Sequence, residues 1–171
     1  FVTVLRDTYW YTRISSFSDP FEDMQGSGYQ VCQSLIALGN GGLKGLGLGN
    51  STTKNLYLPE PQNDFILAVI GEELGYIGFI VLMVAYIVLF FMLIRTAMRA
   101  KDRLGCYLAT GVAVMLALHV AINVAVVTSS MPPTGITLPF VSYGGSSMWI
   151  FMYSIGVALN VSRGQKQNRK A

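Results

Sequence analysis

The sequence has few charged residues for its length. Asp, Glu, Lys and Arg make up 12% of its 171 residues, against about 25% in an ordinary soluble domain. None of them occurs between Leu74 and Ile94 or between Leu104 and Ser162. Hydrophobic residues reach 52% and the mean hydropathy is +0.48. This composition excludes a soluble enzyme, a disordered chain, a collagen and a disulfide scaffold, and it leaves an integral membrane protein.

Histidine and cysteine are also scarce, which argues against most metal-binding and thiol chemistry. The chain has one histidine, His119, and two cysteines, Cys32 and Cys106. It contains no H-E-x-x-H and no C-x-x-C motif. The glycine-rich segment 39–49 fits neither G-x-x-x-x-G-K-[ST] nor G-x-G-x-x-G. We therefore interpret that segment as a flexible or tightly turned loop close to the membrane or to neighbouring helices.

Three apolar runs predict membrane-spanning helices, at about 74–94, 104–128 and 142–162. At about 1.5 Å rise per residue, each is long enough to cross a hydrocarbon core of about 30 Å. The third run is the least apolar, so we expect it to pack inside a bundle. The predicted fold class is an all-α polytopic membrane bundle. Residues 1–73 are expected to hold the end of an upstream helix and a large extracytoplasmic loop with short amphipathic helices, one of them predicted near 29–38.

The positions of Lys and Arg predict the orientation of these helices. Residues 95–103 hold four cations, the tail 163–171 holds four, and 129–141 hold none. Because cations concentrate in cytoplasmic loops, the first loop and the C-terminus are expected inside and residues 1–73 outside. This pattern indicates membrane topology rather than nucleic-acid binding. It also puts Cys32 and Cys106 on opposite faces, too far apart for a disulfide.

Two polar side chains lie inside the second predicted span. His119 precedes Asn123 by four residues, so both belong to one helical face. Interhelical hydrogen bonding, typically worth ~0.6 kcal/mol and at most ~2, is one interpretation of this pair. The other interpretation is that the pair lines a substrate cavity.

The predicted outer loop between the second and third spans contains three prolines and three glycines, in the sequence SSMPPTGITLPFVSYGGSS at 129–147. Such residues break helices and leave backbone polar groups free. At membrane depth this backbone is tolerated only when it is buried in protein or lines a wet cavity. A structural turn and a substrate cavity that presents N–H donors to a pyrophosphate both remain open.

Acidic residues gather in the predicted outer segment. Asp19, Glu22 and Asp23 lie close together beside a Gly-Ser-Gly turn. They are either a solvated loop or a site in which a carboxylate acts as general base or binds a divalent cation. A free aspartate, with a pKa of about 3.9, is ready to accept a proton at neutral pH. Glu72 and Glu73 precede the first span, where acids would favour the helix dipole.

Several stretches resemble the SEDS family of shape, elongation, division and sporulation proteins, which includes FtsW, RodA and SpoVE. The matching stretches follow the family order and look more like FtsW or SpoVE than RodA. They are Gly26–Leu35 (GSGYQVCQSL), Gly45–Ser51 (GLGLGNS), Leu58–Ile66 (LPEPQNDFI), Gly71–Gly75 (GEELG), His119–Asn123 (HVAIN) and Asn123–Ser147 (NVAVVTSSMPPTGITLPFVSYGGSS).

The resemblance implies a ten-helix protein of the bacterial cytoplasmic membrane, of which this chain is the last third. The start at Phe1 with an apolar stretch agrees with a C-terminal piece. Family members polymerise lipid II into glycan strands together with a class B penicillin-binding protein and other division or elongation proteins. Their essential aspartate, in a pattern like W-x-D-P-x-G-S-G-Y-Q, falls on Asp23. Here Phe21 replaces the usual Trp and Met24 the usual Pro.

The sequence and the resemblance together predict a peptidoglycan glycosyltransferase. Asp23 is the predicted catalytic base and also a candidate ligand for a divalent cation, Mg²⁺ or Mn²⁺. The alternatives are a lipid II flippase and a non-catalytic scaffold of the division machinery. The residues predicted to contact substrate are Glu22, Tyr29, Lys44, His119, Asn123, Ser142, Tyr143, Gly144 and Gly145.

Overall fold

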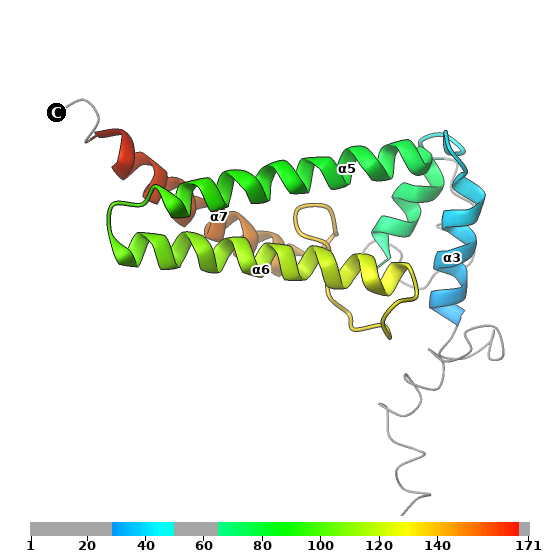
Figure 1. Ribbon diagram of the computed structural model, residues 1–171. Helices are drawn as coiled ribbons and strands as arrows, with labels where there is room; N and C mark the ends of the chain where they lie inside the picture. The colour runs from blue at the N-terminus through cyan, green and yellow to red at the C-terminus, as the bar shows by residue number, and fades with distance from the viewer. Residues whose placement is uncertain (1–28, 50–64, 168–171) are drawn as a thin grey trace, which may run out of the picture.

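The computed structural model describes residues 29–49 and 65–167. Within these ranges the regular structure is entirely helical (Figure 1). This confirms the all-α part of the predicted fold class. The helices are α3 (Tyr29–Gly41), α5 (Ile66–Met98), α6 (Arg103–Val127) and α7 (Gly145–Gln167).

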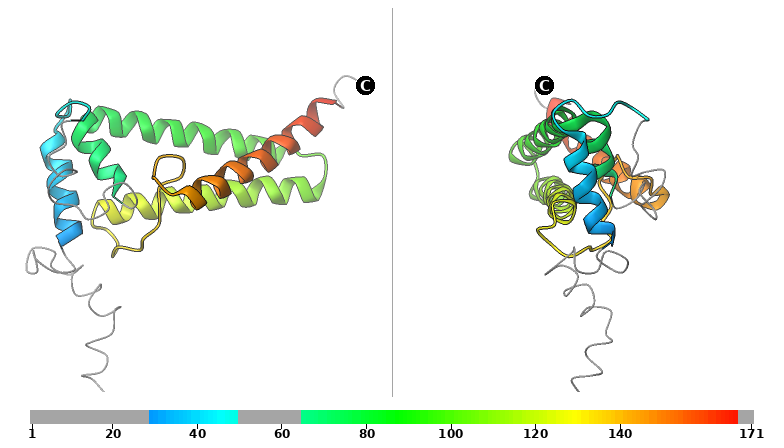
Figure 2. Two further views of the ribbon diagram at one scale, coloured as in Figure 1. Left: turned by 180° about the vertical axis from the view of Figure 1, so that it is seen from behind. Right: turned by 90° about the vertical axis from the view of Figure 1, so that its right-hand side faces the viewer.

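Two long antiparallel helices, α5 and α6, form the body of the bundle and are joined by the short turn 99–102. Helix α7 crosses them at an angle, and α3 lies across the far end, nearly perpendicular to both (Figures 1 and 2). We call these two ends the turn end and the α3 end. Helix α3 packs against α5 and α6 through buried Val31, Cys32 and Ala37. The buried Ser34 hydroxyl lies 3.4 Å from the Val127 carbonyl oxygen of α6.

Helices α5 and α6 are both long and apolar enough to cross a membrane. Only 6% of the most apolar stretch of α5 is buried within the chain. Exposed side chains such as Val81, Ile87 and Phe91 are available to lipid or to other helices. Helix α7 does not meet the same criterion of length and hydropathy. The third membrane span expected at 142–162 therefore stays a prediction, and the helix found there runs from Gly145 to Gln167.

Helix α5 is broken at Gly75, where φ is 69° and ψ is −167°. This conformation is almost restricted to glycine. The segment 42–49 lies against the break and bonds to both helix ends. The N–H groups of Leu46 and Gly47 donate to the carbonyls of Glu72 and Glu73, each at 3.0 Å. These bonds satisfy carbonyls that a helix end otherwise leaves without partners.

On the other side of the break, the N–H of Tyr76 donates to the Gly42 carbonyl at 2.9 Å. The break corrects the expectation for Glu72 and Glu73. They lie at the C-terminal end of the half-helix 66–74, not at the N-terminus of a helix, so the helix dipole does not favour their charges.

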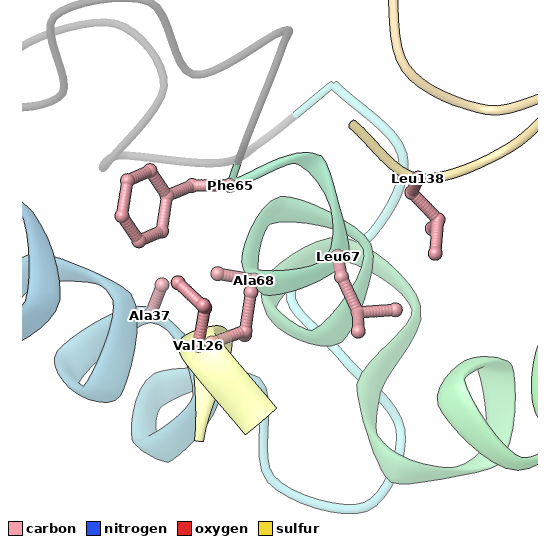
Figure 3. Packing of buried hydrophobic residues seen from close by; sticks show 7 residues of the cluster. Ala37, Phe65, Leu67, Ala68, Val126 and Leu138 are labelled. Atoms are coloured by element: carbon pink, nitrogen blue, oxygen red, sulfur yellow. The ribbon is translucent and has the colours of Figure 1, made fainter. Parts of the chain in front are cut away.

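The hydrophobic core has two parts. The first lies at the α3 end, where α3, the half-helix 66–74, the end of α6 and the following loop meet (Figure 3). The second lies between α5, α6 and α7. Their buried members are Ala37, Phe65, Leu67, Ala68, Val126, Val127 and Leu138 in the first part, and Leu93, Ala113, Leu116, Phe151 and Ala158 in the second.

Candidate functional site

The α6–α7 loop, residues 128–144, is held by side chains of the bundle. The Asn123 amide Nδ2 of α6 donates to the Ile136 carbonyl at 2.8 Å. The Tyr86 hydroxyl of α5 donates to the Pro139 carbonyl. The Leu138 N–H donates to the Ser142 hydroxyl at 2.8 Å. Leu138 and Pro139 are buried, so these bonds provide the partners that backbone away from water requires.

Phe140 anchors the loop deeper in the bundle. Its φ of 64° is uncommon for a bulky residue and is worth about 1–3 kcal/mol of strain. Its ring packs against Phe151 of α7, with centroids 5.8 Å apart, beside the core part formed by α5, α6 and α7. The loop thus reaches the middle of the bundle instead of passing over its end, and α7 begins from that depth (Figure 1).

His119 has two partners within the bundle. Its Nδ1 lies 2.8 Å from the Met115 carbonyl, one turn earlier in α6. Because a carbonyl only accepts, the Nδ1–H group of His119 is the donor in this bond. The ring also meets Phe151 edge to face, with centroids 5.2 Å apart. The hydrogen bond lies within α6 and is not the interhelical bond that was expected, whereas the ring contact does join α6 to α7. The substrate role of His119 stays a prediction.

The structure brings some of the predicted substrate residues together and separates others. Asn123 and Ser142 are buried and hold the same loop segment, 136–139. Tyr143 follows them and is 81% exposed. Gly144 accepts a hydrogen bond from the Ser147 hydroxyl at 3.0 Å, and Gly145 begins α7.

Lys44 is exposed and belongs to the segment that lies against the break in α5. Tyr29 begins α3, and its side chain is outside the described part of the structure, as are Glu22 and Asp23. Among residues 29–49 and 65–167, no group of three or more His, Cys, Asp or Glu side chains is arranged to hold a metal ion. The predicted general base and metal ligand stays a prediction.

The comparisons identify the family. Residues 1–167 match the cell cycle protein family of FtsW, RodA and SpoVE. The chain belongs to this family. It is 51% identical over 160 residues to stage V sporulation protein E of Bacillus subtilis (strain 168). This match covers 94% of the present chain and 44% of the Bacillus protein. The chain is 48% identical over 159 residues to the probable peptidoglycan glycosyltransferase FtsW of Geobacter sp. (strain M18), covering 93% and 43%.

A solved structure is similar to the chain in fold. The chain matches a structure described as "Structural coordination of polymerization and crosslinking by a peptidoglycan synthase complex" with a TM-score of 0.72 and 29% identity. The match covers 97% of this chain and 45% of the other. The chain thus spans less than half the length of the relatives it matches.

Two residues of this FtsW/RodA/SpoVE segment have polar environments that sequence reasoning did not predict. Tyr86 lies in the middle of an apolar run, and only the depth of the α6–α7 loop explains its hydroxyl. Glu73 has a buried carboxylate oxygen, Oε1, without a hydrogen-bond partner among the described residues. The G-E-E-L-G motif was the available signal, because glycines on both sides of two acids allow close backbone contacts.

Ser142→Ala is expected to destabilise the α6–α7 loop by about 1–3 kcal/mol. The change leaves the buried Leu138 N–H without its acceptor. Thermal unfolding of the full-length protein in detergent measures this effect. Ser146→Ala, at an exposed serine four residues on, is the matched control and should change stability by less than about 0.5 kcal/mol. Equal effects of the two changes would contradict a structural role for the Ser142 hydroxyl.

Proposed function

We propose that this chain is part of a peptidoglycan glycosyltransferase that polymerises lipid II into glycan strands. The observation that carries the proposal is the similarity, at 42–48% identity over most of the chain, to several proteins named as probable peptidoglycan glycosyltransferase FtsW. The solved neighbour, whose description names polymerisation by a peptidoglycan synthase complex, supports the same chemistry.

In the proposed reaction Asp23 acts as the general base. Its carboxylate takes the proton from the acceptor hydroxyl of lipid II as that oxygen attacks the anomeric carbon of the growing strand. The new glycosidic C–O bond forms while the C–O bond to undecaprenyl pyrophosphate breaks. The leaving group takes the bonding electrons. A positioned base of this kind typically contributes 10²–10⁴-fold to the rate.

We propose that some of the described residues contribute to substrate binding in this reaction. The α6–α7 loop presents the exposed Tyr143 and the glycines at the start of α7, and it is anchored through Asn123 and Ser142. We propose that this loop forms one wall for the sugar and pyrophosphate. Lys44, exposed beside the break in α5, would contribute positive charge toward the pyrophosphate.

We propose that α7, together with the α6–α7 loop, forms the third membrane-crossing element, with the C-terminus in the bacterial cytoplasm. The loop reaches the middle of the bundle, so a helix starting there needs less length and hydropathy to complete the crossing. The described cations of 95–103 and Arg163 gather at the turn end. Because short cytoplasmic segments are rich in Lys and Arg, this end is the cytoplasmic one.

A class B penicillin-binding protein is the proposed partner. The solved neighbour is described as coordinating polymerisation with crosslinking, so a crosslinking enzyme with a membrane helix fits the proposal. An apolar groove of about 470 Å³ runs between α5 and α6, and its lining includes Ile87, which is 65% exposed. We propose that the partner's membrane helix packs on this groove, since apolar side chains and close packing drive helix association in lipid.

A divalent cation is proposed to assist departure of the pyrophosphate, with Asp23 as a candidate ligand. A chelator such as EDTA is therefore expected to reduce lipid II polymerisation by the full-length protein at least ~10-fold, because the charge of the leaving group would lose its counterion. Adding Mg²⁺ or Mn²⁺ back should restore the rate. The readout is glycan product from labelled lipid II, and an unchanged rate in EDTA would contradict the proposed cation.

A further inference from the structure

A pocket lies at the turn end of the bundle, away from the α6–α7 loop. It has a volume of about 840 Å³ and opens between the first turns of α6 and the last turns of α7. At its floor the two helices approach closely, because a Cβ on Gly105 would lie 3.2 Å from Cγ1 of Val161. The lining residues are Lys101, Asp102, Leu104, Gly105, Leu108, Val157, Asn160, Val161, Arg163 and Gly164.

The lining combines positive charge with apolar walls. Lys101 and Arg163 are exposed, and Asn160 adds an amide that can donate hydrogen bonds. Asp102 carries the opposite charge, so the ionic groups of the lining sum to +1 (two cations and one carboxylate). Leu104, which is 70% exposed, and Leu108, which is 44% exposed, continue the walls onto the apolar outer surface of α6.

We propose that this pocket binds the headgroup of an anionic phospholipid from the cytoplasmic leaflet. The phosphate diester lies between Lys101 and Arg163, and the glycerol and the first acyl carbons lie along Leu104 and Leu108. Basic pockets between membrane helices on the cytoplasmic side suit this class of lipid. A free phosphate would gain nothing from the apolar walls, so the lining favours a lipid as the source of the phosphate.

The test measures binding of short-chain phosphatidylglycerol to the full-length protein in detergent, by native mass spectrometry. Lys101→Gln/Arg163→Gln is expected to weaken binding about tenfold or more, because each basic residue near a membrane surface adds to the attraction of anionic lipid. The matched control is Arg95→Gln/Arg99→Gln, which removes the same charge from exposed residues of the same end outside the pocket. It should change binding less than threefold on the same scale. Equal losses in both pairs would overturn the pocket as the site.

Asp102→Asn is expected to strengthen the binding of phosphatidylglycerol, whereas the loss of the two basic residues weakens it. It removes the one carboxylate of the lining, and the wild-type side chain makes no capping hydrogen bond at the start of α6. Binding of phosphatidylglycerol should therefore tighten roughly two- to fivefold. A zwitterionic phosphatidylcholine probe should bind at least ~10-fold more weakly than phosphatidylglycerol. Competition by glycerol 3-phosphate at the same concentration would overturn the lipid assignment, as would weaker binding in Asp102→Asn.

Discussion

Replacing Asp23 with alanine in the full-length protein is expected to lower lipid II polymerisation by ~10²–10⁴-fold. Without the carboxylate nothing takes the proton from the attacking hydroxyl as the glycosidic bond forms. Asp23→Asn, which keeps the shape and removes the charge, should cause a loss of the same order. The measurement is the rate at which labelled lipid II is converted to glycan strands, at matched protein amounts and melting temperatures.

The control for this change lies four residues earlier in the chain. Asp19 belongs to the same acidic group, but it precedes Pro20, a pairing typical of turns, and the family resemblance places the essential aspartate on Asp23 instead. Asp19→Asn keeps the ability to form that turn, so it should leave the rate within about threefold of wild type. If Asp23→Ala kept the wild-type rate, or if Asp19→Asn lost as much as Asp23→Ala, the assignment of the general base would be wrong.

Gly75→Ala is expected to destabilise the α3 end of the bundle by about 3 kcal/mol or more. The φ of 69° and ψ of −167° cost an L-residue about 1–3 kcal/mol. An added Cβ would also meet the backbone of the segment that lies against the break, including the Leu43 carbonyl oxygen at 2.7 Å and the Gly45 nitrogen. Backbone cannot rotate away, so the hydrogen bonds that close the break would be lost.

Alanine substitutions at two further glycines distinguish the strain of the backbone conformation from the crowding of the added Cβ. Gly42 also has a positive φ, 52°, but a Cβ there meets nothing within 4 Å. Gly42→Ala should therefore cost only the ~1–2 kcal/mol of the left-handed conformation. Gly111 is an exposed glycine inside α6 with open space around its Cβ position. Gly111→Ala should raise the free energy of unfolding by up to about 1 kcal/mol. Thermal unfolding in detergent tests the series, and equal losses at Gly75 and Gly42 would contradict the crowding at the break.

The sequence predicted the helical class well because the signal is long and simple. Uninterrupted apolar runs between basic segments identify α5 and α6 by hydropathy and charge. The break in α5 was not predictable in the same way. Glu72 and Glu73 precede the apolar run and look like the start of a helix, whereas the break at Gly75 makes them the end of one. Only the contacts of Gly75 with the distant segment 42–49 distinguish the two interpretations.

The path of the α6–α7 loop could not be predicted from its local sequence either. Its prolines and glycines indicated irregular backbone near the membrane, but its depth depends on contacts of single side chains with all three neighbouring helices. Tyr86 and Asn123 bond to its carbonyls, and Phe140 packs against Phe151. The candidate general base, in contrast, is supported by the sequence and not by the structure. Asp23 lies outside the described residues, and it is the motif around it that supports its role.

The most direct test of the account uses the full-length protein with the proposed penicillin-binding partner, reconstituted in liposomes with labelled lipid II. Polymer and lipid II translocation are measured in the same sample. The account predicts that glycan strands of many disaccharides accumulate and that the yield of undecaprenyl pyrophosphate rises with the number of bonds formed. Translocation of lipid II without any polymer would contradict the glycosyltransferase and favour a flippase.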